Sequence, residues 1–324
     1  MTGAAALGIA DSVGETFSDP NWAGLGVTMV RAVAPYDVAT TAPVAGTPAG
    51  DRRISFDEWA RNASAAGVEP LVAFEASKDP AKRTAPGRPL APAVAEYSDA
   101  LAAFLTTYPA VRHLAPWNEP NFTGAGNPLS RSPGLAAAYY RELVAVVSRD
   151  GGGRVVAAGE FAGIPGDAYV DGYQAALGPS RPAVWGVHAH TDANRFQAGV
   201  DDTAPAMRFF LSKLGGTWGD STIWIDEIGA YYRDAHGTVW GDDSQRETTS
   251  FILGMARLSP RIERIYYYNF ANHCSTAARC AVQDRGVVSP SPWDGTPLGY
   301  DVAGRVRPNH AVIAGRGPLI APRT

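Results

Sequence analysis

The chain alternates short apolar runs with longer amphipathic runs, and this alternation limits the possible folds more than any other feature. Apolar runs of strand length occur at residues 7–10, 27–34, 70–74, 113–117, 154–159, 184–190, 222–226 and 264–270. Helical periodicity occurs at residues 56–66, 93–107, 135–148, 167–177, 204–214, 244–258 and 309–314. Eight strand candidates alternating with helices predict an α/β protein with a (β/α)8 TIM barrel, rather than an open doubly wound sheet, which usually has fewer strands.

One barrel accounts for the length of the chain. The 324 residues are 45% hydrophobic, and barrels of about 250 residues or more commonly form one domain. We therefore expect a single domain over residues 1–324. Two long loops, 35–55 and 271–307, follow the second and the eighth strand. Both leave from the rim where the strands end, so we expect them to border the functional site.

Two glutamates stand at the ends of two predicted strands. Glu119 lies in HLAPWNEPNF (113–122) and Glu227 in TIWIDEIGA (222–230). A βα-barrel enzyme keeps its chemistry at the carboxyl ends of its strands, and this spacing places the two residues three strand–helix units apart on one rim. Cleavage of a glycosidic bond needs such a pair, because one carboxyl protonates the leaving oxygen while the other attacks or stabilises the positive sugar carbon.

The motifs around these glutamates resemble those of a known group. W-N-E-P at 117–120 after a fourth strand and I-D-E at 225–227 in a seventh are similar to the retaining glycoside hydrolases of clan A, especially the branches with families 5 and 39. The resemblance covers almost the whole chain in strand order. It implies double displacement without a metal or organic cofactor, with Glu119 as acid/base, Glu227 as nucleophile and Asn118 bonded to the sugar 2-hydroxyl. Taken alone, Asn-Glu-Pro would also suit the first turn of a helix.

The two glutamates must differ in protonation. We expect an ionised Glu227 nearby to raise the pKa of Glu119, so that Glu119 holds its proton. Glu227 needs a cation, and Arg31 in the middle of the second strand is the candidate, because a charge inside a barrel is costly unless it is paired. The clan often carries an arginine on this strand. A surface arginine on a misplaced strand is the alternative.

Two histidines occupy the sixth strand, where alternation points His188 and His190 to the same side. The clan frequently shows His-x-Tyr here, with the tyrosine bonding the nucleophile. His190 stands in the tyrosine position, so the partner of Glu227 would be an imidazole or would come from elsewhere. A His-x-His pair on a strand also suits zinc, which would make the chain a metal-dependent hydrolase, although such a site needs further ligands.

Other residues are candidates for binding substrate. The eighth strand ends in YYYNFANH where much of the clan has a sugar-stacking tryptophan. Tyr268 or Phe270, or Trp293 from the following loop, is therefore expected to contact the sugar. Asp11, Glu75 and Glu160 also fall at predicted strand ends. Each could hold a substrate hydroxyl, or could form a structural salt bridge or cap.

Charge and hydropathy limit the partners of the chain. The formal net charge is −4 and the basic residues are scattered, which argues against nucleic acid and against an anionic membrane surface. No apolar run approaches the roughly 18 residues of a membrane span. A neutral polar substrate, such as an oligo- or polysaccharide or a glycoside, fits this composition. A barrel that binds glycans without cleaving them is the alternative.

The two cysteines, Cys274 and Cys280, lie in the polar segment NHCSTAARCAVQD. This spacing favours a local disulfide over a metal site, because the chain has no further cysteine and zinc usually takes four ligands. A disulfide implies export, and free thiols remain the alternative. The first residues carry no signal-peptide pattern but begin almost directly on a strand. We therefore expect a secreted or extracytoplasmic protein whose signal peptide has been removed.

Overall fold

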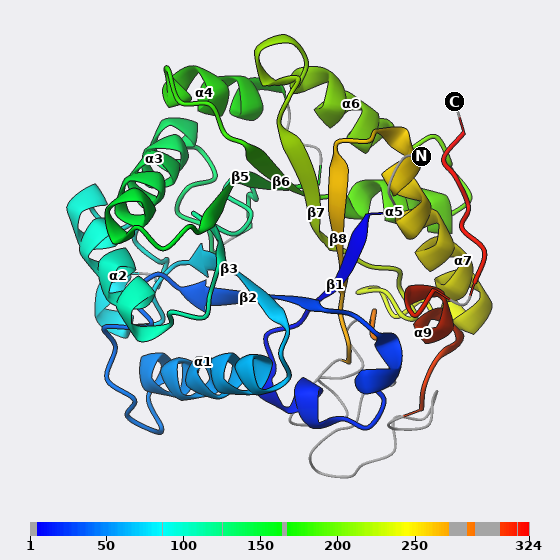
Figure 1. Ribbon diagram of the computed structural model, residues 1–324, viewed down its shortest axis with the longest axis horizontal. Coiled ribbons are helices and arrows are strands. Elements are labelled where there is room, and N and C mark those ends of the chain that lie inside the picture. The colour runs from blue at the N-terminus through cyan, green and yellow to red at the C-terminus, as the bar shows by residue number, and fades with distance from the viewer. Residues whose placement is uncertain are drawn as a thin grey trace.

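The computed structural model describes residues 5–85, 87–124, 126–163, 167–271, 284–288, 305–315 and 317–323. Its strands form a closed barrel in which each pairs in parallel with the next along the chain and β8 returns to β1 (Figure 1). The strands are β1 (Ala6–Ala10), β2 (Met29–Pro35), β3 (Glu69–Glu75), β4 (His113–Ala115), β5 (Val155–Ala162), β6 (Val184–His188), β7 (Thr222–Ile228) and β8 (Ile262–Tyr268). The predicted (β/α)8 TIM barrel is confirmed.

Helices surround the barrel (Figure 1). They are α1 (Pro48–Ala65), α2 (Val94–Thr107), α3 (Pro133–Asp150), α4 (Asp167–Leu177), α5 (His190–Gln197), α6 (Pro205–Lys213), α7 (Gly241–Gly254) and α9 (Pro308–Ile313). Four of them begin with proline, whose missing N–H and fixed φ suit the first helical position. At the start of α1, the Thr47 side chain also accepts a hydrogen bond from Gly50 N at 3.1 Å.

Some boundaries differ from the sequence prediction. The cap at Thr47 starts α1 at Pro48, so the predicted loop 35–55 ends earlier than expected. The sixth strand ends at His188, and the segment up to Gln197 forms α5, which the sequence analysis did not predict. Most of the predicted loop 271–307 lies outside the described residues.

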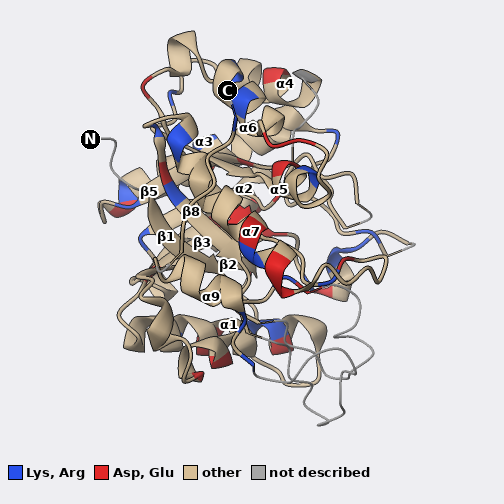
Figure 2. Cartoon of the chain, turned by 90° about the vertical axis from the view of Figure 1, so that its right-hand side faces the viewer, with Lys and Arg blue, Asp and Glu red and all other residues tan. Residues whose placement is uncertain are grey.

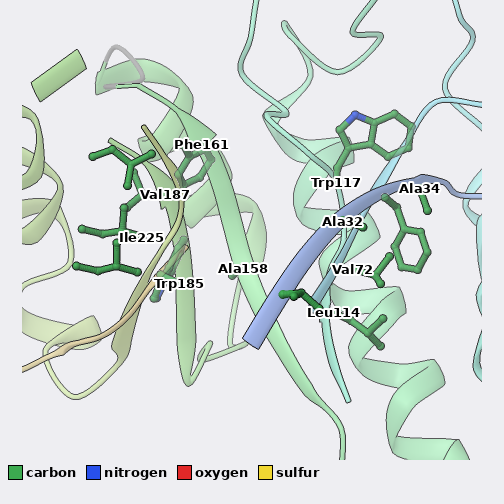
Figure 3. Packing of buried hydrophobic residues seen from close by; sticks show 14 of the residues in the cluster. Ala32, Ala34, Val72, Leu114, Trp117, Ala158, Phe161, Trp185, Val187 and Ile225 are labelled. Carbon is green, nitrogen blue, oxygen red and sulfur yellow. The ribbon is translucent and has the colours of Figure 1, made fainter. Parts of the chain in front are cut away.

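Alternating side chains divide the core into two layers. On β2, Val30, Ala32 and Ala34 face outward into the layer between barrel and helices, part of which Figure 3 shows. Met29 faces inward and packs in the smaller cluster inside the barrel, which also contains Ala10, Leu71, Ala157, Val184, Trp224 and Tyr266. Arg31 is two residues after Met29 on the same strand, so its side chain also points into the barrel. Its guanidinium lies nearer the carboxyl ends of the strands than this apolar cluster.

Charged residues of both signs are interspersed over the helices and loops of the face shown in Figure 2. Among the described residues, none of the helices combines the length and the apolar character that a membrane span needs.

Cys274, Cys280 and Trp293 lie outside the described residues, so the disulfide and the contact of Trp293 with a sugar stay predictions. We expect the unfolded, unreduced protein to react with no thiol reagent and the reduced protein to expose two thiols. Because the closed loop is short, its reduction should cost no more than about 2 kcal/mol of unfolding free energy. Two thiols titrated before reduction would contradict this pairing.

Candidate active site

Glu119 lies at the carboxyl-terminal rim of the barrel, in the segment that follows β4. Its φ of 48° is a left-handed conformation that is uncommon outside glycine and costs about 1–3 kcal/mol. Asn118 N donates to Phe74 O at 2.6 Å, and Glu119 N donates to Glu160 O at 3.1 Å. These bonds attach the strained turn to β3 and β5, which fixes the direction of the Glu119 carboxyl.

Arg31 joins side chains from four other strands or their ends. It is only 1% exposed, which rules out the alternative of a surface arginine. Its guanidinium donates to Glu227 Oε2 and to Glu160 Oε2, each at 2.8 Å, and to Asn118 Oδ1 at 2.7 Å. Burial lowers the pKa of Arg31, but the negative charges of Glu160 and Glu227 outweigh that effect and raise it. Arg31 is therefore a permanent cation that contacts Glu227.

A bulge turns Glu160 into the barrel. Ala158 and Phe161 both pack outward against the helices, although regular alternation would put Phe161 inside. The pairing of β5 with β6 shifts register between Gly159 and Phe161, and Glu160 has φ 51°. Glu160 consequently reaches Arg31 and is completely buried. A bulge of this kind commonly re-aims a side chain next to an active site.

A second irregularity aims Glu227. Ile225 and Ile228 both face the outer layer, and the pairing of β7 with β8 shifts register between them. Two consecutive acids, Asp226 and Glu227, therefore face the interior, where regular alternation would admit one. Glu227 consequently meets Arg31, and its other oxygen, Oε1, lies 3.3 Å from His190 Nε2.

His188 and His190 each contact one of the two glutamates, but they do not both lie on the sixth strand as predicted. His188 ends β6 and its Nδ1 lies 2.9 Å from Glu119 Oε1. His190 is the first residue of α5 rather than a strand residue, so strand alternation does not place it. The ring centroids are nevertheless 6.2 Å apart, and His190 contacts Glu227 from the position the sequence comparison gave to a tyrosine.

The charges around Glu227 keep it ionised. Burial raises the pKa of Glu227, but the charge of His188, the hydrogen bond to His190 and the charge of Arg31 outweigh burial and hold this pKa well below its ordinary value. His190 is neutral at physiological pH, because burial and the charge of Arg285 lower its pKa to about 4. Arg285 Nη1 lies 2.6 Å from His190 Nδ1, which leaves the proton on Nε2, facing Glu227.

Glu119 departs from expectation. Burial raises its pKa, and so does the charge of Glu227, but the hydrogen bond and charge of His188 outweigh both, so the net pKa of Glu119 is lowered and the predicted rise is wrong. The corresponding effect on His188 is a pKa raised to about 9, since Glu227 and Glu119 together outweigh burial. In the free protein the proton of this pair therefore resides on His188, one hydrogen bond away from Glu119.

An inner cavity of about 240 Å³ opens beside Glu119 and is also lined by Glu75, Trp117, Asn118 and Phe122. Two larger cavities, of about 380 and about 490 Å³, lie elsewhere, between α1 and residues 107–111 and beside α5 and α7. Neither of these cavities is lined by Glu119, Glu227 or Arg31. The candidate active site is therefore the inner cavity, at the carboxyl ends of the strands.

Residues 92–289 match the family described as "Glycosyl hydrolase catalytic core". The chain belongs to this family. The match, together with the barrel, confirms the resemblance to clan A glycoside hydrolases. The comparison with curated proteins found no match.

Solved structures share the fold of this glycosyl hydrolase. GH5_18 from Streptomyces cattleya in complex with GlcNAc has 17% identity and a TM-score of 0.64, covering 99% of this chain and 82% of its own. A monomeric beta-xylosidase from Caulobacter crescentus has 13% identity and a TM-score of 0.62, covering 96% of this chain and 67% of its own. A glucosidase from Croceicoccus marinus has 16% identity and a TM-score of 0.54, covering 82% of this chain; the matched part spans only 59% of that glucosidase.

Asp226 is a site residue of this glycosyl hydrolase that the sequence analysis missed. It is fully buried, and burial and the charge of Glu160 raise its pKa well above the ordinary value. The charges of His188 and Arg31 oppose this rise without reversing it, and Asp226 Oδ1 lies 3.5 Å from His188 Nε2. Gly186 leaves room for this aspartate, because a Cβ there would come within 1.9 Å of Asp226 Oδ2. The acid before Glu227 in I-D-E was the available signal.

Arg285 was also missed, because it lies in the long segment after β8 and belongs to no motif. It stacks on the Tyr231 ring at 3.6 Å and donates to Gly229 O at 2.5 Å. These contacts hold it against His190, whose tautomer it sets. A buried arginine from a distant loop carries no local sequence signature.

The remaining candidates divide into two groups. Tyr268 faces the site, with its ring centroid 6.3 Å from that of His190. Asp11 instead accepts hydrogen bonds from Val13 N at 3.0 Å and Phe270 N at 3.2 Å, which favours the capping alternative. Glu160 has no exposed surface and its carboxylate faces Arg31, so it orients Arg31 rather than a substrate hydroxyl.

The arrangement around the histidines bears on the metal alternative. Ligand atoms of His188, His190 and Glu227 lie within 4.8 Å of one another, a spacing that suits an ion. Arg31, however, already presents a positive charge there, 2.8 Å from Glu227 Oε2 and 3.2 Å from His188 Nε2. A protonated His188 has no lone pair to offer a metal ion, and Glu227 is already paired with Arg31 and His190, so these three groups do not fit a metal site.

Proposed function

We propose that the chain is a retaining glycoside hydrolase that works by double displacement, with Glu119 as acid/base and Glu227 as nucleophile. Membership of the glycosyl hydrolase family supports cleavage of a glycosidic bond. The observation that carries the assignment of roles is the buried Arg31, which contacts Glu227 directly and lies beside His188, the partner of Glu119.

In the first step a Glu227 oxygen forms a bond to the anomeric carbon while the bond from that carbon to the leaving oxygen breaks. Glu119 gives its proton to the leaving oxygen. Because the free pair keeps this proton on His188, it first moves along the 2.9 Å contact from Nδ1 to Glu119 Oε1. A sugar that excludes water from Glu119 favours this transfer, since desolvation raises the pKa of a carboxyl.

The second step reverses these roles. Bonding of Glu227 to the sugar removes its negative charge, which otherwise raises the pKa of both Glu119 and His188. Loss of that charge lowers the pKa of Glu119, so Glu119 stays ionised and takes the proton of an incoming water. The water oxygen bonds to the anomeric carbon as the bond to Glu227 breaks and releases Glu227 as a carboxylate. The charge of Glu227 therefore helps the pair to hold its proton before bond formation, and the loss of that charge keeps Glu119 ionised afterwards.

Covalent labelling tests this proposal. Fluorinated aryl glycosides of pentoses and hexoses, in both anomers, should add one sugar to the peptide that contains Glu227, and EDTA should leave turnover unchanged. Turnover with label on another residue would overturn the assignment of Glu227. Turnover abolished by EDTA and restored by a metal ion would favour the metal-dependent alternative. Binding of a glycan without turnover of any substrate would favour the non-catalytic barrel.

The pH profile tests the proton pair. Because the pKa of His188 is raised to about 9, the pair keeps its proton up to about that pH and loses it above. We expect kcat/KM of an unactivated glycoside to fall as pH rises through about 9, since the free enzyme then lacks its acid. His188→Asn should move this alkaline limb to lower pH. An unchanged limb in that variant would show that another group holds the proton.

We also propose that the protein is exported and that Cys274 and Cys280 form a disulfide outside the cytoplasm. A carbohydrate outside the cell would be the substrate. Counting the thiols of the unfolded protein before and after reduction tests whether the disulfide is present.

A further inference from the structure

Beside Glu119 the rim carries a hollow that the catalytic roles do not explain. The inner cavity adjoins an outer cavity of about 320 Å³, and the two share Pro89 and Asn127 in their walls. The walls come from the loops that follow β3 and β4. Together the two cavities are comparable with small-ligand sites, which measure roughly 300–1,000 Å³. We call this hollow the basic cleft and define it by Arg83, Arg88, Phe122, Asn127 and Arg131.

The charge of the basic cleft differs from that of the chain. The whole protein carries a formal −4, which favours a neutral substrate, yet the outer cavity is lined by Arg88 and Arg131 and by no acid among the described residues. Arg83 lines the inner cavity. Lys78 there is paired with Glu75 at 2.8 Å, but none of the three arginines has an acidic partner within the described part of the chain. The positive charges of these three arginines are therefore available to bind an anionic ligand.

The other walls suit a sugar ring. Phe122 is 52% exposed and lines the inner cavity, so its ring offers an apolar face for stacking. Asn127 fixes the loop around it, because its amide donates to the backbone oxygens of Glu119 and Phe122 at 2.8 and 3.0 Å. Thr123 and Ser130 add hydroxyls to the outer cavity. The loops after β3 and β4 thus place arginines, a ring and hydroxyls around two adjoining cavities, the inner of which is lined by Glu119.

We propose that the basic cleft binds a sugar unit carrying an anionic group, a carboxylate or a sulfate, next to the unit whose bond is cleaved. The guanidinium fork matches either oxyanion with two parallel hydrogen bonds. The substrate class is then an acidic oligo- or polysaccharide rather than a neutral one. This inference rests on the proposed glycosidase function and names its substrate.

The test measures binding apart from turnover. Isothermal titration in the Glu227→Ala background, where no turnover consumes the ligand, compares a neutral galactose trimer with its uronic acid counterpart and with a sulfated galactan oligosaccharide. We expect at least one acidic ligand to bind about tenfold or more tightly than the neutral one. Arg88→Gln with Arg131→Gln should remove that advantage, and added salt should weaken it.

Arg61→Gln is the matched control, because Arg61 is an exposed arginine that lines a cavity at the opposite rim, and it should leave the preference intact. Tight binding of the uronic acid alone identifies a carboxylate site, and tight binding of the sulfated ligand alone identifies a sulfate site. Equal binding of acidic and neutral ligands, or a preference that survives loss of Arg88 and Arg131, overturns the inference. Failure of the glycosidase function would instead show as absent turnover of aryl glycosides by the unmutated protein.

Discussion

Glu227→Ala is expected to abolish turnover of every glycoside, including aryl glycosides with excellent leaving groups, by on the order of 10⁴-fold or more. The variant lacks the atom that bonds to the anomeric carbon, and a good leaving group cannot replace it. Steady-state rates with an activated aryl glycoside measure this loss. Azide should restore part of the activity, because a small anion can enter the space of the lost carboxylate, and the product should have inverted configuration.

Glu263→Ala is the matched control for this variant, since Glu263 is an exposed glutamate on the neighbouring strand β8. It should leave the rate within about twofold, as surface substitutions usually do. Loss of Glu227 also removes one acceptor of the buried Arg31, so unfolding curves of the variant are needed beside the rates. Turnover of aryl glycosides within about tenfold of the unmutated protein would show that Glu227 is not the nucleophile.

The barrel was predictable because each buried parallel strand forms a continuous apolar run, and eight such runs alternate with amphipathic helices. The mispredicted helix boundaries have local causes that leave no trace in the hydrophobic periodicity. The cap formed by Thr47 and Pro48 lengthened α1, and a short polar helix, α5, followed directly on β6 without an apolar stripe of its own.

The site was predictable in part for a similar reason. Glu119, Glu227 and Arg31 stand at strand positions that the barrel brings together. The bulges in β5 and β7 could not be read from the sequence, because a bulge changes which side chains face inward without changing composition. Asp226 was therefore passed over as a neighbour of the nucleophile, and Arg285 required knowledge of how a distant loop folds back.

The pKa of Glu119 shows why a pair of residues cannot be treated in isolation. Repulsion from Glu227 acts in the expected direction, but a third group, His188, is closer to Glu119 and reverses the net effect. The resemblance suggested His190 as the partner of Glu227, but the sequence assigned no partner to His188. The structure gives His188 to Glu119 and His190 to Glu227, so one histidine is charged and the other neutral.

Glu119→Ala should separate the two steps of the reaction. Natural glycosides, which need protonation of the leaving oxygen, should lose about 10²- to 10⁴-fold in rate, the usual effect of general acid–base help. Activated aryl glycosides need little such help in the first step. They should still form the covalent sugar on Glu227, which then accumulates because no base activates water, and mass spectrometry of the intact protein detects it.

The assignment of Glu119 depends on how much more the variant slows natural glycosides than activated aryl glycosides. Misfolding would lower both rates together, whereas loss of the acid lowers the rate with natural glycosides far more. The same variant should also lose the alkaline limb near pH 9, since that limb reports the proton that His188 passes to Glu119. Turnover of a natural glycoside within about tenfold of the unmutated protein would show that Glu119 is not the acid. The acid would then be sought at Glu75, which lines the same cavity, because Glu160 is completely buried beneath Arg31 and cannot reach a leaving oxygen.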